Sequence, residues 1–226
     1  MGILAVNGGT PVITPGTLKT LPWPPVCEET AEKIKELYLS RQWSFNSPSE
    51  QAFEKAFAEY QGAKHGIFMM NGTVTLEAAL AALGVGPGDE VIIPGLTWIA
   101  TAMSIRYVGA IPVFADMEPS TMALDPAAFE AAITPRTKAV IPVHLYGTLA
   151  DLDRILAIAN KHGIAVVEDC AHAQGGMWKG RGVGSWGAVG SFSFQQSKTL
   201  AAGESGICLT NDDALAERLY RFKHIG

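Results

Sequence analysis

Between residues 65 and 168, short apolar segments alternate with longer segments that have helical spacing. The apolar segments predict strands at 65–70, 90–93, 111–115, 137–143 and 164–168. The segments between them predict helices at 73–83, 98–107, 125–133 and 151–162. Strands separated by helices of about ten residues form βαβ units with right-handed crossovers. The sequence therefore predicts an α/β fold whose mostly parallel sheet is flanked by helices.

Outside this alternation the pattern is different. Strands are predicted at 189–194 and 206–209, before a last helix at 211–222. On the other side, Ser47 and Pro48 begin a helix that runs to about Tyr60, because a serine cap followed by proline starts helices. Residues 28–40 also have helical spacing. We expect two parts, an N-terminal arm and helix at 1–48 and a large domain at 49–226.

The arm is predicted from composition. Up to Pro25 the chain is rich in glycine, proline and threonine, which favours an extended segment. Trp23 stands among prolines and could anchor this arm on a surface. The arm begins without the basic and apolar regions of a signal peptide, so we expect no secretory leader.

Composition excludes several classes of protein. Of the 226 residues, 48% are hydrophobic and 17% are charged, which is typical of one large globular domain. The net charge is -5 and basic residues do not cluster, so we expect no nucleic-acid partner and no membrane attachment. Three widely spaced cysteines are typical of reduced thiols in a cytoplasmic protein rather than of a disulfide framework.

Two strand ends carry chemistry-bearing side chains. The predicted strand at 164–168 runs into Asp169, and the strand at 189–194 is followed by Lys198 in a loop of small polar residues. Ligands of open α/β sheets bind at the carboxyl ends of strands. An acid and an amine at two such ends predict a site, although Lys198 alone would be read as a solvated lysine.

Two further segments fall on the same edge. The turn Asn71-Gly72-Thr73 joins a strand to a helix, where backbone N–H groups and the helix dipole can hold a phosphate. The plainer alternative is an ordinary helix cap by Asn71 or Thr73. Trp98 opens the next helix, where it could pack in the core or stack on a flat ligand.

Other motifs favour structural roles. Residues 182–187 match G-x-G-x-x-G but do not lie between a strand and a helix, so they predict a loop that approaches something closely rather than a dinucleotide site. Asp169, Cys170 and His172 have no second cluster, so we expect no metal. His144 is expected to be packed and hydrogen-bonded, and Cys170 to be a buried thiol.

Together the parts match one cofactor. Pyridoxal phosphate needs a phosphate cradle, an aromatic plate, an anion at its ring nitrogen and an amine for its Schiff base. The phosphate turn, Trp98, Asp169 and Lys198 supply one of each. The combination predicts a pyridoxal-phosphate site.

These segments resemble the DegT/DnrJ/EryC1/StrS family of sugar aminotransferases, which have the aspartate-aminotransferase-like fold. The resemblance runs from about Asn7 to the end, and residues 178–184 and 194–198 resemble the members that aminate keto-cyclitols such as scyllo-inosose. It implies that Lys198 binds the cofactor aldehyde and Asp169 pairs with the ring nitrogen. It also implies cofactor contacts by Gly72, Thr73, Val74, Trp98, His172 and Ser193. Ser205 stands where relatives often have glycine.

The resemblance has further implications. It implies ping-pong amino transfer from glutamate or glutamine to a keto-sugar or keto-cyclitol, in a homodimer with a shared site. Family members continue into a smaller C-terminal domain, so we expect this chain to be the N-terminal part of a longer enzyme and incomplete as it stands. A pyridoxal-phosphate sugar dehydratase and a non-catalytic chain that binds the cofactor are the alternatives. Lys198 argues against the first, since histidine replaces this lysine in the family's dehydratases.

Overall fold

The computed structural model describes residues 2–13, 16–17, 22–44 and 46–225. A seven-stranded sheet forms its centre, in the spatial order β1-β9-β8-β5-β4-β2-β3. Only β9 runs against the other strands of this sheet. The α/β fold with a mostly parallel sheet is therefore confirmed. The strands are β1 His65–Met69, β2 Glu90–Pro94, β3 Ile111–Ala115, β4 Thr137–Val140, β5 Ala165–Asp169, β8 Val189–Ser193 and β9 Gly206–Thr210.

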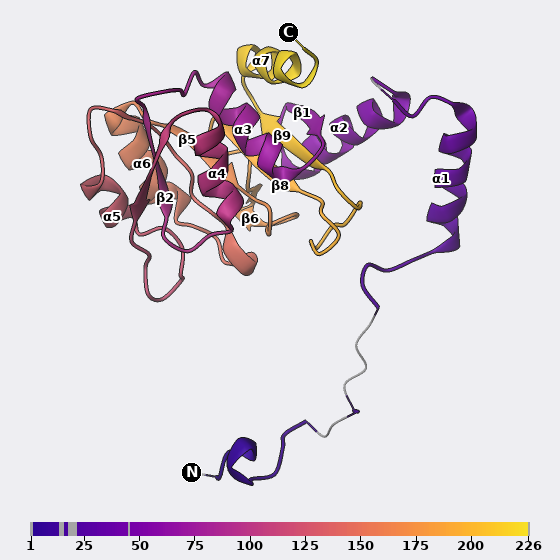
Figure 1. The fold of residues 1–226 in the computed structure, drawn as a ribbon, viewed down its shortest axis with the longest axis horizontal. Coiled ribbons are helices and arrows are strands. Elements are labelled where there is room, and N and C mark those ends of the chain that lie inside the picture. The colour runs from indigo at the N-terminus through magenta and orange to yellow at the C-terminus, as the bar shows by residue number, and fades with distance from the viewer. Residues whose placement is uncertain (1, 14–15, 18–21, 45, 226) are drawn as a thin grey trace.

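Helices cover both faces of the sheet (Figure 1). One face is packed by α3, α4 and α7, and the other by α2, α5 and α6. None of the described helices is both long enough and apolar enough to cross a membrane. The helices are α1 Glu28–Ser40, α2 Pro48–Gln61, α3 Gly72–Ala82, α4 Ile99–Tyr107, α5 Pro126–Ala131, α6 Leu152–His162 and α7 Asp213–Lys223, with 3₁₀ turns η1 Ala5–Asn7 and η2 Leu145–Gly147.

The strands are apolar on both faces because both faces are covered. In β2, Val91 and Ile93 pack against α3 and α4, whereas Ile92 packs against α5 and α6. All three side chains are fully buried. Side chains alternate between the two faces of a strand, so one continuous apolar run supplies both cores.

Most predicted elements lie within two residues of the observed ones, and β4 is the clearest exception. The strand predicted at 137–143 forms a ladder only over Thr137–Val140, with a single bridge further on between Val143 and Asp169. Pro142 has no N–H to donate, which interrupts the ladder. The small hairpin of β6 (Met177–Trp178) and β7 (Arg181–Gly182) was not predicted.

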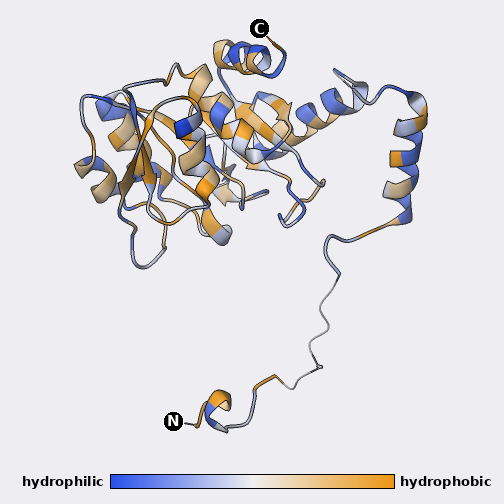
Figure 2. Ribbon diagram, in the orientation of Figure 1, coloured by the Kyte–Doolittle hydropathy of each residue, from blue (hydrophilic) through white to orange (hydrophobic). Residues whose placement is uncertain are grey.

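The N-terminal part differs from the rest. Helix α1 forms where it was predicted but lies apart from the sheet (Figure 2). Its apolar side chains Ile34, Tyr38 and Leu39 are exposed. Within the predicted arm the described residues include η1, while residues 14–15 and 18–21 lie outside the described part. Trp23 Nε1 donates to the carbonyl oxygen of Gln196 at 2.9 Å. The arm is therefore held against the loop that carries Lys198, in agreement with the predicted anchor.

Candidate active site

Asp169 ends β5, and its side chain is 5% exposed. Its Oδ2 accepts a hydrogen bond from Thr101 Oγ1 at 2.9 Å, and its Oδ1 accepts one from the Ala171 amide at 3.2 Å. The Thr101 hydroxyl is also 2.7 Å from that of Thr97, one turn earlier. Among the described residues, the hydrogen-bond donors to this carboxylate are a hydroxyl and a backbone amide, both neutral. Its negative charge remains available to a ligand.

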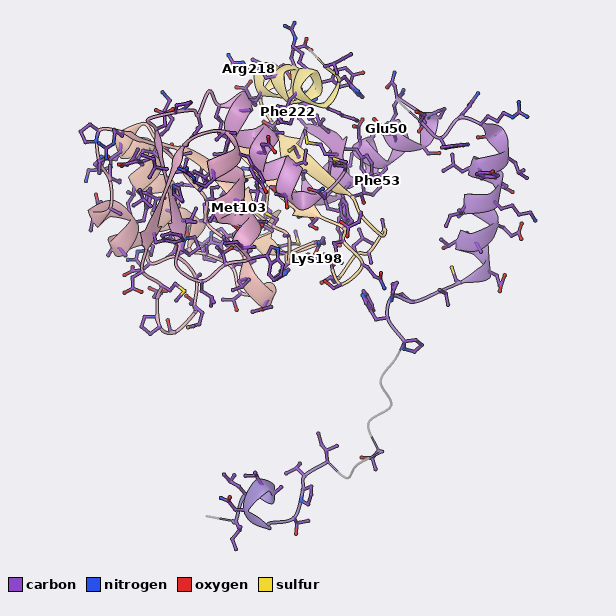
Figure 3. The ribbon with its side chains drawn as sticks, in the orientation of Figure 1. Glu50, Phe53, Met103, Lys198, Arg218 and Phe222 are labelled. Carbon is purple, nitrogen blue, oxygen red and sulfur yellow. The ribbon has the colours of Figure 1, made fainter. Side chains whose placement is uncertain are left out.

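Lys198 lies in the loop between β8 and β9, near the passing N-terminal arm (Figure 3). Its side chain is half-buried. Burial lowers the pKa of its amine, and the charge of Asp169 acts in the opposite direction. Because β5 and β8 pair in parallel, the predicted acid and amine follow neighbouring strands at one edge of the sheet. A lowered pKa favours the neutral amine, which is the nucleophilic form.

The predicted phosphate turn forms the N-terminus of α3. Asn71 Oδ1 accepts hydrogen bonds from the amides of Thr73 at 3.0 Å and Val74 at 2.9 Å, so the plainer alternative of a cap is present. Gly72 lies against Ser193 on β8, since a Cβ at Gly72 would be 2.7 Å from Ser193 Cβ. The four residues expected at the phosphate are therefore neighbours. Their contact with a phosphate remains a prediction.

His172 follows β5 and is covered by an aromatic ring. Its ring stacks on Tyr146, with centroids 5.2 Å apart and planes 21° from parallel. Tyr146 has φ 53°, the left-handed region that residues other than glycine seldom adopt. Burial lowers the pKa of His172, and the positive charge of Lys198 lowers it further. His172 therefore shares the electrostatic environment of the predicted acid and amine.

Trp98 lies at the start of α4, in the loop that follows β2. Its side chain is 71% exposed, which excludes the core position that was its plainer alternative. The carboxyl end of β2 lies at the same edge of the sheet as that of β5, because both strands run parallel to β4, which lies between them. An exposed ring there is available to a ligand.

Three residues near this site were not singled out from sequence. Thr101 could have been found by its helical spacing from Thr97, whereas nothing in the sequence indicates that Tyr146 stacks on His172. Glu168 precedes Asp169 and is fully buried. Its carboxylate is the partner of the glycine-rich loop at 182–187, which was expected to approach something closely.

His144, Glu168 and Cys170 form a buried group whose ligand-type atoms lie within 4.8 Å of one another. His144 is packed and hydrogen-bonded, as predicted. Both oxygens of Glu168 accept hydrogen bonds from the protein, which gives the group a structural explanation without an ion. Burial, together with the charges of Glu168 and Asp169, raises the pKa of the Cys170 thiol, so it is a poor nucleophile.

Ser205 raised a question about backbone geometry because relatives often have glycine there. In the structure it is buried, and it is not one of the described residues with positive φ. Its carbonyl oxygen accepts from the Phe194 amide at 2.8 Å. The loop that holds Lys198 therefore does not require glycine at this position.

The site's chemistry fits pyridoxal phosphate. A carboxylate with neutral partners suits a pyridinium nitrogen, and a half-buried amine with a lowered pKa suits an aldehyde. A hydroxyl beside the first turn of a helix suits a phosphate. These groups lie on a mostly parallel sheet at the carboxyl ends of its strands, where ligands of α/β proteins bind. The fold and site therefore define the class of α/β enzymes that use this cofactor.

The comparison with protein families identifies the group. Residues 25–226 match the DegT/DnrJ/EryC1/StrS aminotransferase family, and the chain belongs to it. The fold is that of the large domain of the fold type I sugar aminotransferases. Members of this family bind pyridoxal phosphate, and the Streptococcus pneumoniae protein Spr1654 has been solved in its PLP-form. It is 30% identical to this chain, with a TM-score of 0.84, over 92% of this chain and 57% of that one.

Two further relatives are more similar in sequence. L-glutamine:2-deoxy-scyllo-inosose aminotransferase of Streptomyces kanamyceticus is 45% identical over 99% of this chain and 53% of its own length. The structure of an aminotransferase from Psychrobacter cryohalolentis is 41% identical with a TM-score of 0.86, over 88% of this chain and 51% of that one. The chain thus spans about half the length of the relatives it matches.

Proposed function

We propose that the protein to which this chain belongs is a pyridoxal-phosphate aminotransferase that transfers an amino group to a keto-cyclitol or keto-sugar. The observation that carries the proposal is the position of Asp169 at the end of β5 and of Lys198 in the loop after β8, two neighbouring parallel strands. We propose glutamine or glutamate as the amino donor, in keeping with the glutamine named for the S. kanamyceticus relative.

When bound, pyridoxal phosphate supplies an aldehyde that takes up amino groups and a ring that accepts electrons. Asp169 would hold a proton at the ring nitrogen, because a buried carboxylate favours a positive charge beside it. Thr101 keeps that carboxylate in place through its hydrogen bond to Oδ2. Lys198 Nζ would bind the aldehyde carbon and, once displaced by the amino donor, carry a proton between carbon atoms.

The remaining predicted residues would hold and orient the cofactor. Gly72, Thr73, Val74 and Ser193 would bind its phosphate at the start of α3. Trp98 would stack on the ring, and His172 would lie near the ring hydroxyl. No metal is needed in this scheme.

Room for an acceptor is present beside the site. A cavity of about 300 Å³ is lined by loops that follow β2, β3 and β4, including Leu96, Met122 and Tyr146. Tyr146 is also the residue that stacks on His172, so the cavity and the cofactor site share one wall. A six-membered ring bearing a ketone would fit a cavity of this size, which is at the small end of ligand pockets.

We further propose a cytoplasmic homodimer in which a second copy completes the site. The exposed apolar residues of α1 support an arm that packs on another chain. In this proposal the arm and helix span residues 1–48 and the large domain spans 49–226. In this proposal the 226 residues hold the cofactor-binding half, and the isolated chain has little aminotransferase activity.

The test is cofactor attachment, which needs no turnover. The chain is mixed with pyridoxal phosphate, its absorbance is recorded, and the adduct is reduced with borohydride and located by mass spectrometry. We expect the label on Lys198, and Lys198→Ala to remove the absorbance band with a loss of at least about 100-fold in attachment. Lys55→Ala, which changes an exposed lysine of α2, is the matched control. An unchanged band in Lys198→Ala would refute the assignment.

A further inference from the structure

We propose that Glu168 is a positioning residue, which fixes the Asp169 carboxylate by holding the loop at 182–187 and His144 against the end of β5. The proposal rests on the proposed function, because the ring nitrogen gives the position of Asp169 its chemical consequence. Its starting point is a pair of adjacent acids, of which the aminotransferase chemistry uses only one.

The Glu168 carboxylate is surrounded by backbone donors. Its Oε1 accepts hydrogen bonds from the amides of Trp186 at 2.8 Å and Gly187 at 2.7 Å. Its Oε2 accepts one from the Gly184 amide at 2.7 Å. The side chain is fully buried, so these bonds replace water that the carboxylate would otherwise bind. One carboxylate therefore holds three backbone amides within four residues of an irregular loop.

His144 provides the fourth donor. Its Nδ1 accepts a hydrogen bond from the Ala150 amide at 3.1 Å, which leaves the proton of a neutral ring on Nε2. Nε2 lies 3.3 Å from Glu168 Oε2 and donates to it. Since an ionised carboxylate offers about four acceptor sites, the four donors use its full capacity.

The glycines of the loop make this arrangement possible. Gly184 has φ +81°, and a Cβ there would lie 2.4 Å from the ring of Phe192. A Cβ at Gly187 would lie 2.5 Å from the carbonyl oxygen of Val166. Only residues without a side chain can bring these amides so close to β5 and β8. The loop that matches G-x-G-x-x-G thus binds a carboxylate of its own chain, that of Glu168.

The backbone connects Glu168 to the site. Glu168 and Asp169 are consecutive in β5, so their side chains point to opposite faces of the sheet. The Asp169 amide donates to the carbonyl oxygen of Pro142 at 2.9 Å, and the His144 amide donates to the carbonyl oxygen of Asp169 at 3.0 Å. His144 is therefore bound twice, to the Glu168 side chain and to the Asp169 backbone. A change at Glu168 is transmitted to Asp169 through this double connection.

The experiment measures the position of Asp169 without requiring cofactor. The Ala171 amide donates to Asp169 Oδ1, so its hydrogen exchange, followed by NMR, reports on that carboxylate. Glu168→Gln places an NH₂ group against backbone N–H donors. We expect exchange at Ala171 to become about tenfold faster. With pyridoxal phosphate added, we expect the pH midpoint of the bound-cofactor absorbance to shift.

Glu90→Gln is the matched control, because Glu90 is a buried carboxylate at the amino end of β2, at the edge of the sheet opposite to Asp169. Glu90→Gln should alter neither the hydrogen exchange of the Ala171 amide nor the pH midpoint of the absorbance, even if it lowers the unfolding temperature as much as Glu168→Gln does. The amide of Ala214, which donates to Asp212 Oδ1, is the reference for exchange in every variant.

A second pair of variants decides the question if Glu168→Gln does not fold. His144→Asn can still accept from the Ala150 amide but lacks the donor to Glu168, whereas His144→Gln can place an NH₂ group near the Nε2 position. We expect His144→Asn to accelerate exchange at Ala171 and His144→Gln to restore it. Wild-type exchange in both would overturn the proposal.

Failure of this inference differs from failure of the proposed function. If Asp169→Asn shifts the cofactor midpoint while Glu168→Gln leaves the midpoint and Ala171 exchange unchanged, only the positioning role is wrong. If the cofactor does not attach at Lys198, the aminotransferase proposal fails. The exchange measurements then still decide whether Glu168 positions Asp169.

Discussion

The two ends of the sheet bury their acids in different ways. At the amino end of β2, Glu90 is bound by the guanidinium of Arg136 and the hydroxyl of Thr134, and these hydrogen bonds lower its pKa. At the carboxyl end of β5, Asp169 is bound by the Thr101 hydroxyl and a backbone amide. Glu90 has a cation of its own, whereas the hydrogen-bond donors to Asp169 in the described part of the chain are neutral. The difference indicates which buried acid is built for stability and which can serve a positively charged ligand.

The contrast between the two acids is tested most directly by removing one charge at each end of the sheet. We expect Asp169→Asn to weaken cofactor binding by about 100-fold, because a neutral amide cannot stabilise a proton on the ring nitrogen. Glu90→Gln should leave that binding unchanged and lower stability instead. Cofactor absorbance and thermal unfolding of both variants provide the measurements. Equal cofactor effects in the two variants would contradict the contrast.

A smaller effect is expected from the hydroxyl partners. Thr101→Val keeps the shape of the side chain but removes its hydrogen bond to Asp169, which is typically worth about 1 kcal/mol. We expect roughly fivefold weaker cofactor binding, measured by absorbance titration, because the carboxylate loses one of its two fixed donors. Thr134→Val is the matched change at Glu90 and should affect unfolding but not the cofactor. Unaltered binding in Thr101→Val would show that Asp169 is held in another way.

The smallest effect is a pH dependence of stability at His172. Its pKa is lowered in the folded chain, so the unfolded chain binds a proton more readily. The stability that this histidine contributes is fully present above its ordinary pKa of about 6.5 and is lost as the pH falls from there through the lowered folded-state value. Unfolding midpoints between about pH 5 and 8 should therefore be less pH-dependent in His172→Gln than in the wild type. An identical pH dependence in the two proteins would exclude this contribution.

The contrast between α1 and β5 shows how far the sequence could lead. The bounds of α1 were predicted without error, because helical spacing is a local property, whereas the exposure of its apolar side chains could not be read from that spacing. The end of β5 was predicted within one residue, and Asp169 was singled out because a buried strand ran into it. The role of Glu168 was not found, because its donors lie in a loop sixteen or more residues further along.

By itself, the sequence determined the order of strands and helices, the α/β class and the residues that carry the family resemblance. Those features depend on side-chain periodicity and on motifs within short segments, which a chain carries before it folds. The tertiary structure decided which acid faces which partner. Asp169 and Glu168 are chemically similar neighbours, and the strand turns one toward Thr101 and the other toward the glycine-rich loop. That choice depends on packing between segments distant in sequence, so only the folded chain could make it.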